Sequence, residues 1–230
     1  MSNKIIQVMI LSALLIFIVP TPGPSADKEA EVALPAPETK GAVSLEESLN
    51  MRRSIRRYKS SPVKLAHVSQ ILWAAGGLRV DAVGSASRTF PSAGGLYPLD
   101  FYLVAGNVTG LSAGVYRYLP KRHKLKITMG RDVRKALSSA ALGQGSIKNA
   151  PFTIVITAAY KKTTWKYGKR GIRFVHMDTG HAGANIVLSA SALGLGVVTI
   201  GAFNDDQVNK VLKLPKEETA LYILPIGIRR

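Results

Sequence analysis

Apolar residues recur at the spacing of an amphipathic helix in several parts of the chain. Between Leu65 and Trp73 they fall three and four residues apart, and a pair of glycines ends that pattern. Ser44 and Glu47 stand three residues apart, which is the spacing of a capping box and predicts the start of a helix. The pattern as a whole predicts helices over residues 44–51, 65–73, 132–142, 175–193 and 205–212.

Strand patterns are interspersed with these helices. Runs rich in β-branched and aromatic residues predict strands over residues 99–105, 114–118, 125–127, 152–158, 197–200 and 220–226. The run at 152–158 has no polar alternation, which indicates a strand covered on both faces. Because helices and strands follow one another without a regular βαβ repeat, we expect an α+β domain.

The N-terminal part of the chain differs in composition from the rest. Lys4 precedes an apolar run from Ile5 to Val19, which is shorter than the ~20 residues of a comfortable membrane span and fits an export signal. Ala26 suits a cleavage site, but Pro24 suits it poorly. We therefore expect residues 1–26 to be a signal peptide or an N-terminal membrane anchor, 27–43 an acidic Pro/Ala-rich linker, and 44–230 one domain. An exported, periplasmic or membrane-anchored protein is favoured over a cytoplasmic one.

The formal charge of +17 is unevenly distributed. Residues 1–50 contain three Lys and six Asp or Glu, so residues 51–230 carry +20. Such a surplus favours anionic partners: a phosphorylated cofactor, an anionic membrane surface or nucleic acid. The lack of cysteine excludes disulfides and thiolate sites, so redox chemistry requires a bound cofactor. The histidines show no metal-ligand spacing, and we expect no metal site.

Three segments contain groups suited to a cofactor. Arg52-Arg53-Ser54-Ile55-Arg56-Arg57-Tyr58 offers guanidinium forks and a hydroxyl to a phosphate, or else forms a solvated basic patch or a nucleic-acid contact. Arg88-Thr89-Phe90-Pro91-Ser92-Ala93-Gly94-Gly95-Leu96-Tyr97-Pro98 leaves backbone amides open to a flat ring or an anion, unless it is a plain surface turn. The stretch 194–205 ends a strand at Gly201-Ala202, where an exposed amide can donate to a cofactor, or which is an ordinary strand end.

The order of these segments resembles the nitroreductase superfamily. Asn149-Ala150-Pro151 and the closing Leu224-Pro225-Ile226-Gly227-Ile228-Arg229 extend the resemblance over about residues 44–230. The string Pro91-Ser92-Ala93-Gly94-Gly95-Leu96-Tyr97-Pro98 is similar to the SagB-type dehydrogenase branch. This resemblance implies a nitroreductase-like FMN-binding fold, in which helices flank a central, mostly antiparallel sheet and the flavin lies at the interface of a homodimer.

The resemblance also implies roles for individual residues. The phosphate and ribityl chain of FMN would be held by Arg52, Arg53, Ser54, Arg56 and Arg229, with Arg230 as a substitute for Arg229. The isoalloxazine ring would be bordered by Pro91, Ser92, Ala93, Gly94 and Gly95. The backbone of Gly201 and Ala202 would face flavin N5, and Tyr97 is a candidate for contacting the substrate. We expect these segments to converge on one slot.

The helix at 175–193 resembles the central dimer helix of the family. Its Ala182, Gly183 and Ala184 would permit close helix approach. His181 and Asn185 lie four residues apart on one helical face. For these two we favour a buried, hydrogen-bonded structural role over contact with flavin or with a second subunit.

The function implied is that of an FMN-dependent oxidoreductase. Hydride would move by a ping-pong mechanism between NAD(P)H and an organic acceptor such as a nitroaromatic or quinone. SagB-type relatives instead oxidise azolines in peptides within a multi-protein complex, which suits the export-like N-terminus poorly. A non-enzymatic module that binds nucleic acid or an anionic surface would use the +20 charge, but the sequence lacks an aromatic-interleaved basic motif, and we expect no nucleic-acid partner.

Overall fold

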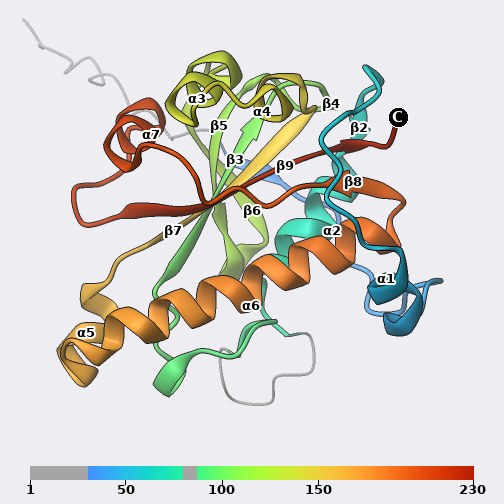
Figure 1. Cartoon of the computed structure of the whole chain (residues 1–230). Coiled ribbons are helices and arrows are strands. Elements are labelled where there is room, and N and C mark those ends of the chain that lie inside the picture. Colours follow the sequence, from blue (N-terminus) through green and yellow to red (C-terminus); the bar gives the residue numbers. More distant parts are fainter. Residues whose placement is uncertain (1–30, 80–86) are drawn as a thin grey trace, which may run out of the picture.

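The computed structural model describes residues 31–79 and 87–230 (Figure 1). The predicted signal peptide or anchor at 1–26 and the first residues of the predicted linker lie outside the described residues. Within the described ranges, no helix combines the length and the apolar character that crossing a membrane requires.

A large antiparallel sheet runs through the middle of the domain. Its strands are β1 (Glu31–Ala33), β3 (Leu99–Ala105), β5 (Gly114–Leu119), β6 (Lys124–Met129), β7 (Phe152–Ala158), β8 (Leu195–Val197) and β9 (Thr219–Ile228). They are ordered β1-β6-β5-β3-β7-β9-β8, and every neighbouring pair is antiparallel. Two short strands, β2 (Val63–Lys64) and β4 (Val108–Thr109), form a separate parallel pair.

Helices cover both faces of this sheet (Figure 1). The helices α2 (Leu65–Gly76) and α6 (Arg170–Ala192) pack on one face, and α3 (Arg134–Ala140), α4 (Gly145–Asn149) and α7 (Asp205–Leu212) pack on the other. Toward the two ends of α6 lie α5 (Lys161–Tyr167) and α1 (Leu45–Met51). Two 3₁₀ turns, η1 (Ala93–Gly95) and η2 (Pro120–Arg122), complete the described elements.

The central strands are buried on both faces because their side chains alternate between two hydrophobic clusters. In β3, Phe101 and Leu103 join the cluster under α2 and α6, whereas Tyr102 and Val104 join the cluster under α3 and α7. All seven residues of β7 are buried, which confirms the prediction from its continuous apolar run. The α+β fold with an antiparallel sheet flanked by helices is therefore confirmed.

Several predicted boundaries need correction. The capping box is present, and α7 has the predicted bounds. The strand predicted at 197–200 is wrong in extent, because β8 ends at Val197 and Ile200 forms only an isolated bridge with Ile223. The long helix begins at Arg170, five residues before its predicted start. The sequence pattern missed α4 and α5, which are too short to show a helical period.

Part of the segment predicted to be a linker packs on the domain. β1 adds an edge strand to β6, and the hydroxyl of Ser69 donates to the carbonyl of Pro35 at 2.6 Å. The Glu38 amide donates to Gln70 Oε1 at 2.8 Å, and Gln70 Nε2 donates to the Glu38 carbonyl at 3.0 Å. Residues 31–38 therefore run along the sheet edge and under α2.

We expect Gly76→Ala to destabilise the domain because a Cβ at this position would overlap the ring of Phe101. Overpacking of a close-packed core costs about 1–3 kcal/mol. Gly130→Ala is the matched control, since its Cβ would find its nearest atom, Ile127 Cδ1, at 3.9 Å. The measurement is the free energy of unfolding of each variant in urea. Equal values for Gly76→Ala and Gly130→Ala would contradict the packing of Gly76 against Phe101.

Candidate cofactor site

The arginine-rich segment is extended and lies along the edge of the sheet. Ser54 forms a parallel bridge with Val197, and the Ile55 amide donates to the Val197 carbonyl at 2.9 Å. Four residues later, Tyr58 pairs with Arg229 at the end of β9. The predicted ligands of this segment, Arg52, Arg53, Ser54 and Arg56, are all exposed, so their polar groups are accessible to an anion.

Two glycines provide room for this segment. A Cβ on Gly196 would lie 2.5 Å from Ile55 Cγ2, and one on Gly227 would lie 2.8 Å from Tyr58 Cγ. The Tyr58 hydroxyl lies 2.9 Å from the carbonyl oxygens of Ile55 and Pro225, and burial raises its pKa, so it remains protonated and donates. Among the described residues, the segment is held by its backbone and by Ile55 and Tyr58, and its arginine head groups form no hydrogen bond or ion pair there.

A strongly basic hollow of about 780 Å³ adjoins this segment. The cationic residues that line it are Arg56, Arg57, Lys59, Arg134, Lys148 and Arg230, and its described lining contains no acidic residue. Arg134 is paired with Asp132 at 2.7 Å, which lies outside the lining. The charge of the others favours an anionic ligand such as a phosphate.

Arg229 and Arg230 have different surroundings. The Nε of Arg229 donates to the Leu195 carbonyl at 3.0 Å, which ties that side chain to β8. Arg230 lines the basic hollow together with Arg56. The sequence did not decide which of the two arginines would reach the phosphate. Arg230 lies in the basic hollow, whereas Arg229 helps to hold β8 at the edge of the sheet.

Gly201 and Ala202 are exposed after the bridge between Ile200 and Ile223. Neither backbone amide has an acceptor among the described residues, and a Cβ on Gly201 would meet nothing within 4 Å. The carbonyl of Ala202 accepts a hydrogen bond from Gln144 Nε2 at 3.0 Å. Sequence reasoning missed Gln144, whose role depends on a contact 58 residues away along the chain. This strand end therefore presents two free donors on a fixed backbone.

The second predicted segment is a tight turn anchored to α6. Gly94 and Gly95 have φ values of +60° and +66°, which glycine adopts without strain. The Ser92 hydroxyl donates to Asp178 Oδ2 at 2.5 Å and accepts from the Tyr97 amide at 3.0 Å. Burial raises the pKa of the Asp178 carboxyl, and hydrogen bonds from Ser92 and from the Ala93 amide oppose that rise. A hollow of about 290 Å³ lies here, lined by Pro91, Ser92, Ala93, Phe174, Met177, Asp178 and His181.

Two polar side chains from α5 reach this turn, and sequence reasoning missed both. A Cβ on Gly94 would lie 2.6 Å from the hydroxyl of Tyr167 and 3.2 Å from the Nζ of Lys166. The Lys166 ammonium also lies 5.5 Å from the centre of the Tyr167 ring. The sequence feature that could have indicated a short helix here is Gly168, which ends α5 with a positive φ.

Tyr97 is engaged in contacts that hold the turn. Its ring packs edge-on against Phe90 at 5.5 Å, and the Arg88 guanidinium lies 5.3 Å from the ring centre. Its hydroxyl accepts from the Arg88 amide at 3.2 Å. These contacts use both the ring and the hydroxyl of Tyr97 to hold the turn.

The two halves of the predicted site lie at different positions along α6. The Ser92 turn is fixed at Asp178, whereas the arginine segment pairs with Val197, beyond the end of the helix. The helix rises 1.5 Å per residue, so Asp178 and Ala192 are separated by about 21 Å. The basic hollow beside the arginine segment and the hollow beside the Ser92 turn share no lining residue.

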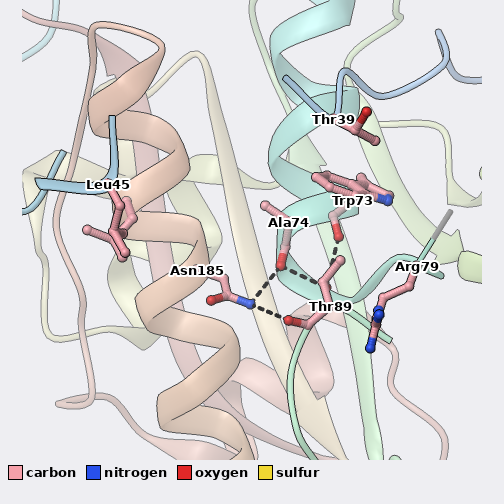
Figure 2. A pocket seen from close by; sticks show the side chains of 8 residues that line it. Thr39, Leu45, Trp73, Ala74, Arg79, Thr89 and Asn185 are labelled. Atoms are coloured by element: carbon pink, nitrogen blue, oxygen red, sulfur yellow. Dashed lines mark hydrogen bonds between the residues drawn. The ribbon is translucent and has the colours of Figure 1, made fainter. Parts of the chain in front are cut away.

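An apolar hollow of about 690 Å³ lies between α1, α2 and α6 (Figure 2). Leu45 and Trp73 stand on its two sides, and Asn185 lies between them with its Nδ2 donating to the carbonyls of Ala74 and Thr89 at 3.1 Å each. Asn185 therefore has the structural hydrogen bonds that the sequence analysis favoured. His181 is exposed and lines the hollow beside Ser92, so the buried role expected for it is wrong.

The small residues of α6 are only partly available to another helix. Ala182 is in the chain's own core, and a Cβ on Gly183 would lie 2.9 Å from the ring of Tyr222. The expectation that these two residues admit a neighbouring subunit is wrong, because they pack against the sheet. Ala184 and Gly180 are exposed on the opposite side of the helix.

Comparison with known proteins gives a consistent result. Residues 49–228 match the profile of the Nitroreductase family. The chain is 43% identical over 197 residues to "Putative nitroreductase MJ1384" of Methanocaldococcus jannaschii, with 86% of this chain and 96% of that protein covered. It is 31% identical over 146 residues to the microcin B17-processing protein McbC of Escherichia coli, covering 61% of this chain and 54% of that protein. A nitroreductase-type crystal structure from Ralstonia eutropha superposes with a TM-score of 0.76 at 28% identity, covering 91% and 95% of the two chains.

We expect Ser92→Ala to destabilise the domain at neutral pH. The variant removes a hydrogen bond to a carboxylate that is 3% exposed, and a hydrogen bond to a charged group contributes about 1.5–3 kcal/mol. Because the folded-state pKa of Asp178 is raised, the loss should be smaller at acid pH, where the carboxyl is protonated. Unfolding in urea measures it at both pH values.

Ser139→Ala is the matched control for this experiment. Ser139 is exposed, and its hydroxyl bonds only to the Lys135 carbonyl of its own helix, at 3.2 Å. Its effect should stay within about 0.5 kcal/mol at every pH. If Ser92→Ala behaved like this control, the anchoring role of the Ser92–Asp178 bond would be refuted.

Proposed function

Since this chain belongs to the nitroreductase family, in its SagB-type branch, and is an FMN-type oxidoreductase, we propose that two copies of it hold FMN between them. We further propose that hydride moves by a ping-pong mechanism between NAD(P)H and an organic acceptor such as a nitroaromatic or quinone. The observation that carries the proposal is the pair of free amides at Gly201 and Ala202, on the same sheet edge as the exposed arginine segment.

The basic edge of the sheet fits the phosphate end of FMN. Phosphate oxygens accept charge-assisted hydrogen bonds from guanidinium groups and from hydroxyls. Arg52, Arg53, Ser54 and Arg56 supply both kinds of donor, and Arg230 adds a cation from the far end of the chain. Arg229 would act by holding β8 in place, since its Nε is already bonded to Leu195.

The free amides fit the redox end of the flavin. When bound, FMN would supply the capacity to accept and return a hydride at its ring atom N5. Gly201 and Ala202 would donate hydrogen bonds toward that part of the ring, and Gln144 would keep the Ala202 peptide in position. Preorganised backbone donors of this kind stabilise developing charge without having to rearrange.

The Ser92–Gly95 turn would serve the site of the other copy. The turn is fixed at Asp178 and the arginine segment lies beyond the C-terminal end of α6, with about 21 Å of helix between Asp178 and Ala192. This spacing along α6 favours a site in which the two segments come from different copies. In a symmetric dimer with α6 at the interface, the turn of one copy can face the sheet edge of the other. Gly180 and Ala184 are both exposed, and at these two positions α6 has no bulky side chain to keep another helix away.

Lys166 and Tyr167 would then be the polar groups on the substrate side. Reduction of a quinone or a nitro group consumes protons as well as electrons, so donors close to the acceptor oxygen assist it. The Tyr167 hydroxyl and the Lys166 ammonium both lie over Gly94. Tyr97 is less suited to this role, because its hydroxyl is engaged with the Arg88 amide.

A second candidate substrate is an azoline ring in a peptide. The similarity to the microcin B17-processing protein supports it, although the alignment covers 61% of this chain. Oxidation of an azoline removes a hydride, which FMN would accept, and a proton, which a water molecule beside the ring could accept. A loss of two mass units per ring from an azoline peptide would support this substrate, whereas turnover of a quinone with NAD(P)H alone supports the first.

We expect the purified full-length chain to be yellow and to release FMN on denaturation. Replacing a guanidinium that binds phosphate costs about 1.5–3 kcal/mol, so Arg56→Ala and Arg230→Ala should each weaken FMN binding roughly 10- to 100-fold. Lys121→Ala, an exposed cation on η2, should leave affinity unchanged. Quenching of FMN fluorescence measures all three, and a colourless protein that also refuses added FMN would refute the cofactor.

Complementation tests whether two chains build each site. One variant carries Arg52→Ala and Arg56→Ala, and the other carries Lys166→Ala and Tyr167→Phe. In a symmetric dimer, co-expression should restore about a quarter of wild-type turnover, because half of the dimers are mixed and each of those keeps one intact site of two. Either variant expressed alone serves as the control. Mixtures no more active than the separate variants would show that the four residues do not act across subunits.

A further inference from the structure

One corner of the molecule combines exposed apolar side chains with a dense positive charge. We define the α5–α6 corner as residues 161–173, which contains α5 and the first turn of α6 (Figure 1). Trp165 is 73% exposed and Ile172 is 45% exposed. Exposed apolar side chains that occur together on a surface, with polar residues around them, mark an interaction site.

The charge of this corner has a single sign. Its basic residues are Lys161, Lys162, Lys166, Lys169, Arg170 and Arg173, and the sequence from 159 to 177 contains no Asp or Glu. Lys162 is paired with Asp100 at 3.3 Å. A shallow hollow of about 580 Å³ is lined by Lys169, Arg170, Ile172, Arg173 and His176. The corner is therefore open, cationic and partly apolar.

We propose that the α5–α6 corner docks on the surface of an anionic lipid membrane. Tryptophan concentrates at membrane–water interfaces because its ring is apolar and its N–H is polar. Each Lys or Arg close to an anionic lipid surface contributes about 1 kcal/mol, which is roughly a fivefold gain in binding. Lys and Arg side chains together with exposed Trp and aliphatic side chains are the composition of helices that lie in the membrane interface.

A membrane explains this composition better than nucleic acid does. A phosphate backbone would use the cations but would leave Ile172 and the Trp165 ring without an apolar partner. The apolar run from Ile5 to Val19 is an independent feature that would keep the same chain close to a bilayer. Trp165 also directly precedes Lys166 and Tyr167, so docking would bring the substrate side to the lipid surface, a consequence that rests on the proposed function.

Fluorescence quenching by brominated lipids tests the docking on the full chain. The protein is mixed with vesicles of phosphatidylcholine and phosphatidylglycerol, with and without bromine on the acyl chains. Trp165 should shift to shorter wavelength and be quenched, and this signal should be absent from Trp165→Phe. High salt should weaken it, because the Debye length falls from ~10 Å at 0.1 M to ~3 Å at 1 M. Pure phosphatidylcholine vesicles should give little quenching.

Charge reversal separates this surface from the net charge of the protein. The triple variant Lys169→Glu, Arg170→Glu and Arg173→Glu should bind the vesicles at least 100-fold more weakly, as measured by the quenching of Trp165. This figure assumes about a fivefold loss of binding for each basic residue. Lys210→Glu with Lys213→Glu and Lys216→Glu changes the charge equally around α7 and should leave the signal intact. Because Trp165 is read out directly, membrane insertion of residues 1–26 does not mimic the result.

Three outcomes would overturn the proposal. Trp165 could remain unquenched by brominated anionic vesicles, or respond to a DNA duplex and not to vesicles. It could also be shielded from a water-soluble quencher before any lipid is added, which would place it in a contact between subunits. FMN content is measured in the same samples, so a protein that docks but lacks FMN would refute the proposed function and leave the docking surface standing.

Discussion

The geometry of the candidate site depends on α6, a helix of 23 residues that behaves as a rigid spacer. Its N-terminal half fixes the Ser92 turn through Asp178, and the chain beyond its C-terminal end forms β8, on which the arginine segment lies. A helix cannot shorten without breaking its backbone hydrogen bonds, so the separation of about 21 Å is a fixed property of the chain. If FMN is held between two copies, as proposed, dimer formation and cofactor binding are coupled.

The arginine segment shows how the fold keeps a cationic site available. If the arginines of this segment formed salt bridges within the chain, those ion pairs would have to break before an anion could bind. The segment is held instead by backbone pairing with Val197 and by packing of Ile55 and Tyr58. Gly196 and Gly227 make the close approach possible, because any Cβ at either position would enter the volume that the segment occupies. The mutual repulsion of the arginines is then relieved when an anion binds, which gives the ligand a share in the stability of the folded state.

Sequence patterns were sufficient for the elements whose signal is local. The continuous burial of β7, the capping box at Ser44 and the bounds of α7 follow from spacing within the element itself. The contacts of Lys166 and Tyr167 with Gly94 could not be found this way, since they join α5 to a turn more than seventy residues away. The separation of the two predicted halves of the site was also invisible, because the order of motifs along a chain does not state whether they meet within one copy or between two.

Basic residues of the domain gather at two distinct places. The basic hollow near Arg56 and Arg230 is polar and contains no large exposed apolar side chain, as a site for a phosphate should be. The α5–α6 corner adds Trp165 and Ile172 to its cations, which a phosphate cannot use. Salt weakens the binding of anions at both places, so salt dependence alone does not distinguish the two sites. The exposed apolar side chains, which are present at only one of them, do distinguish them. Net charge thus attracts anionic partners in general, and the neighbouring apolar surface decides which kind of anion each place retains.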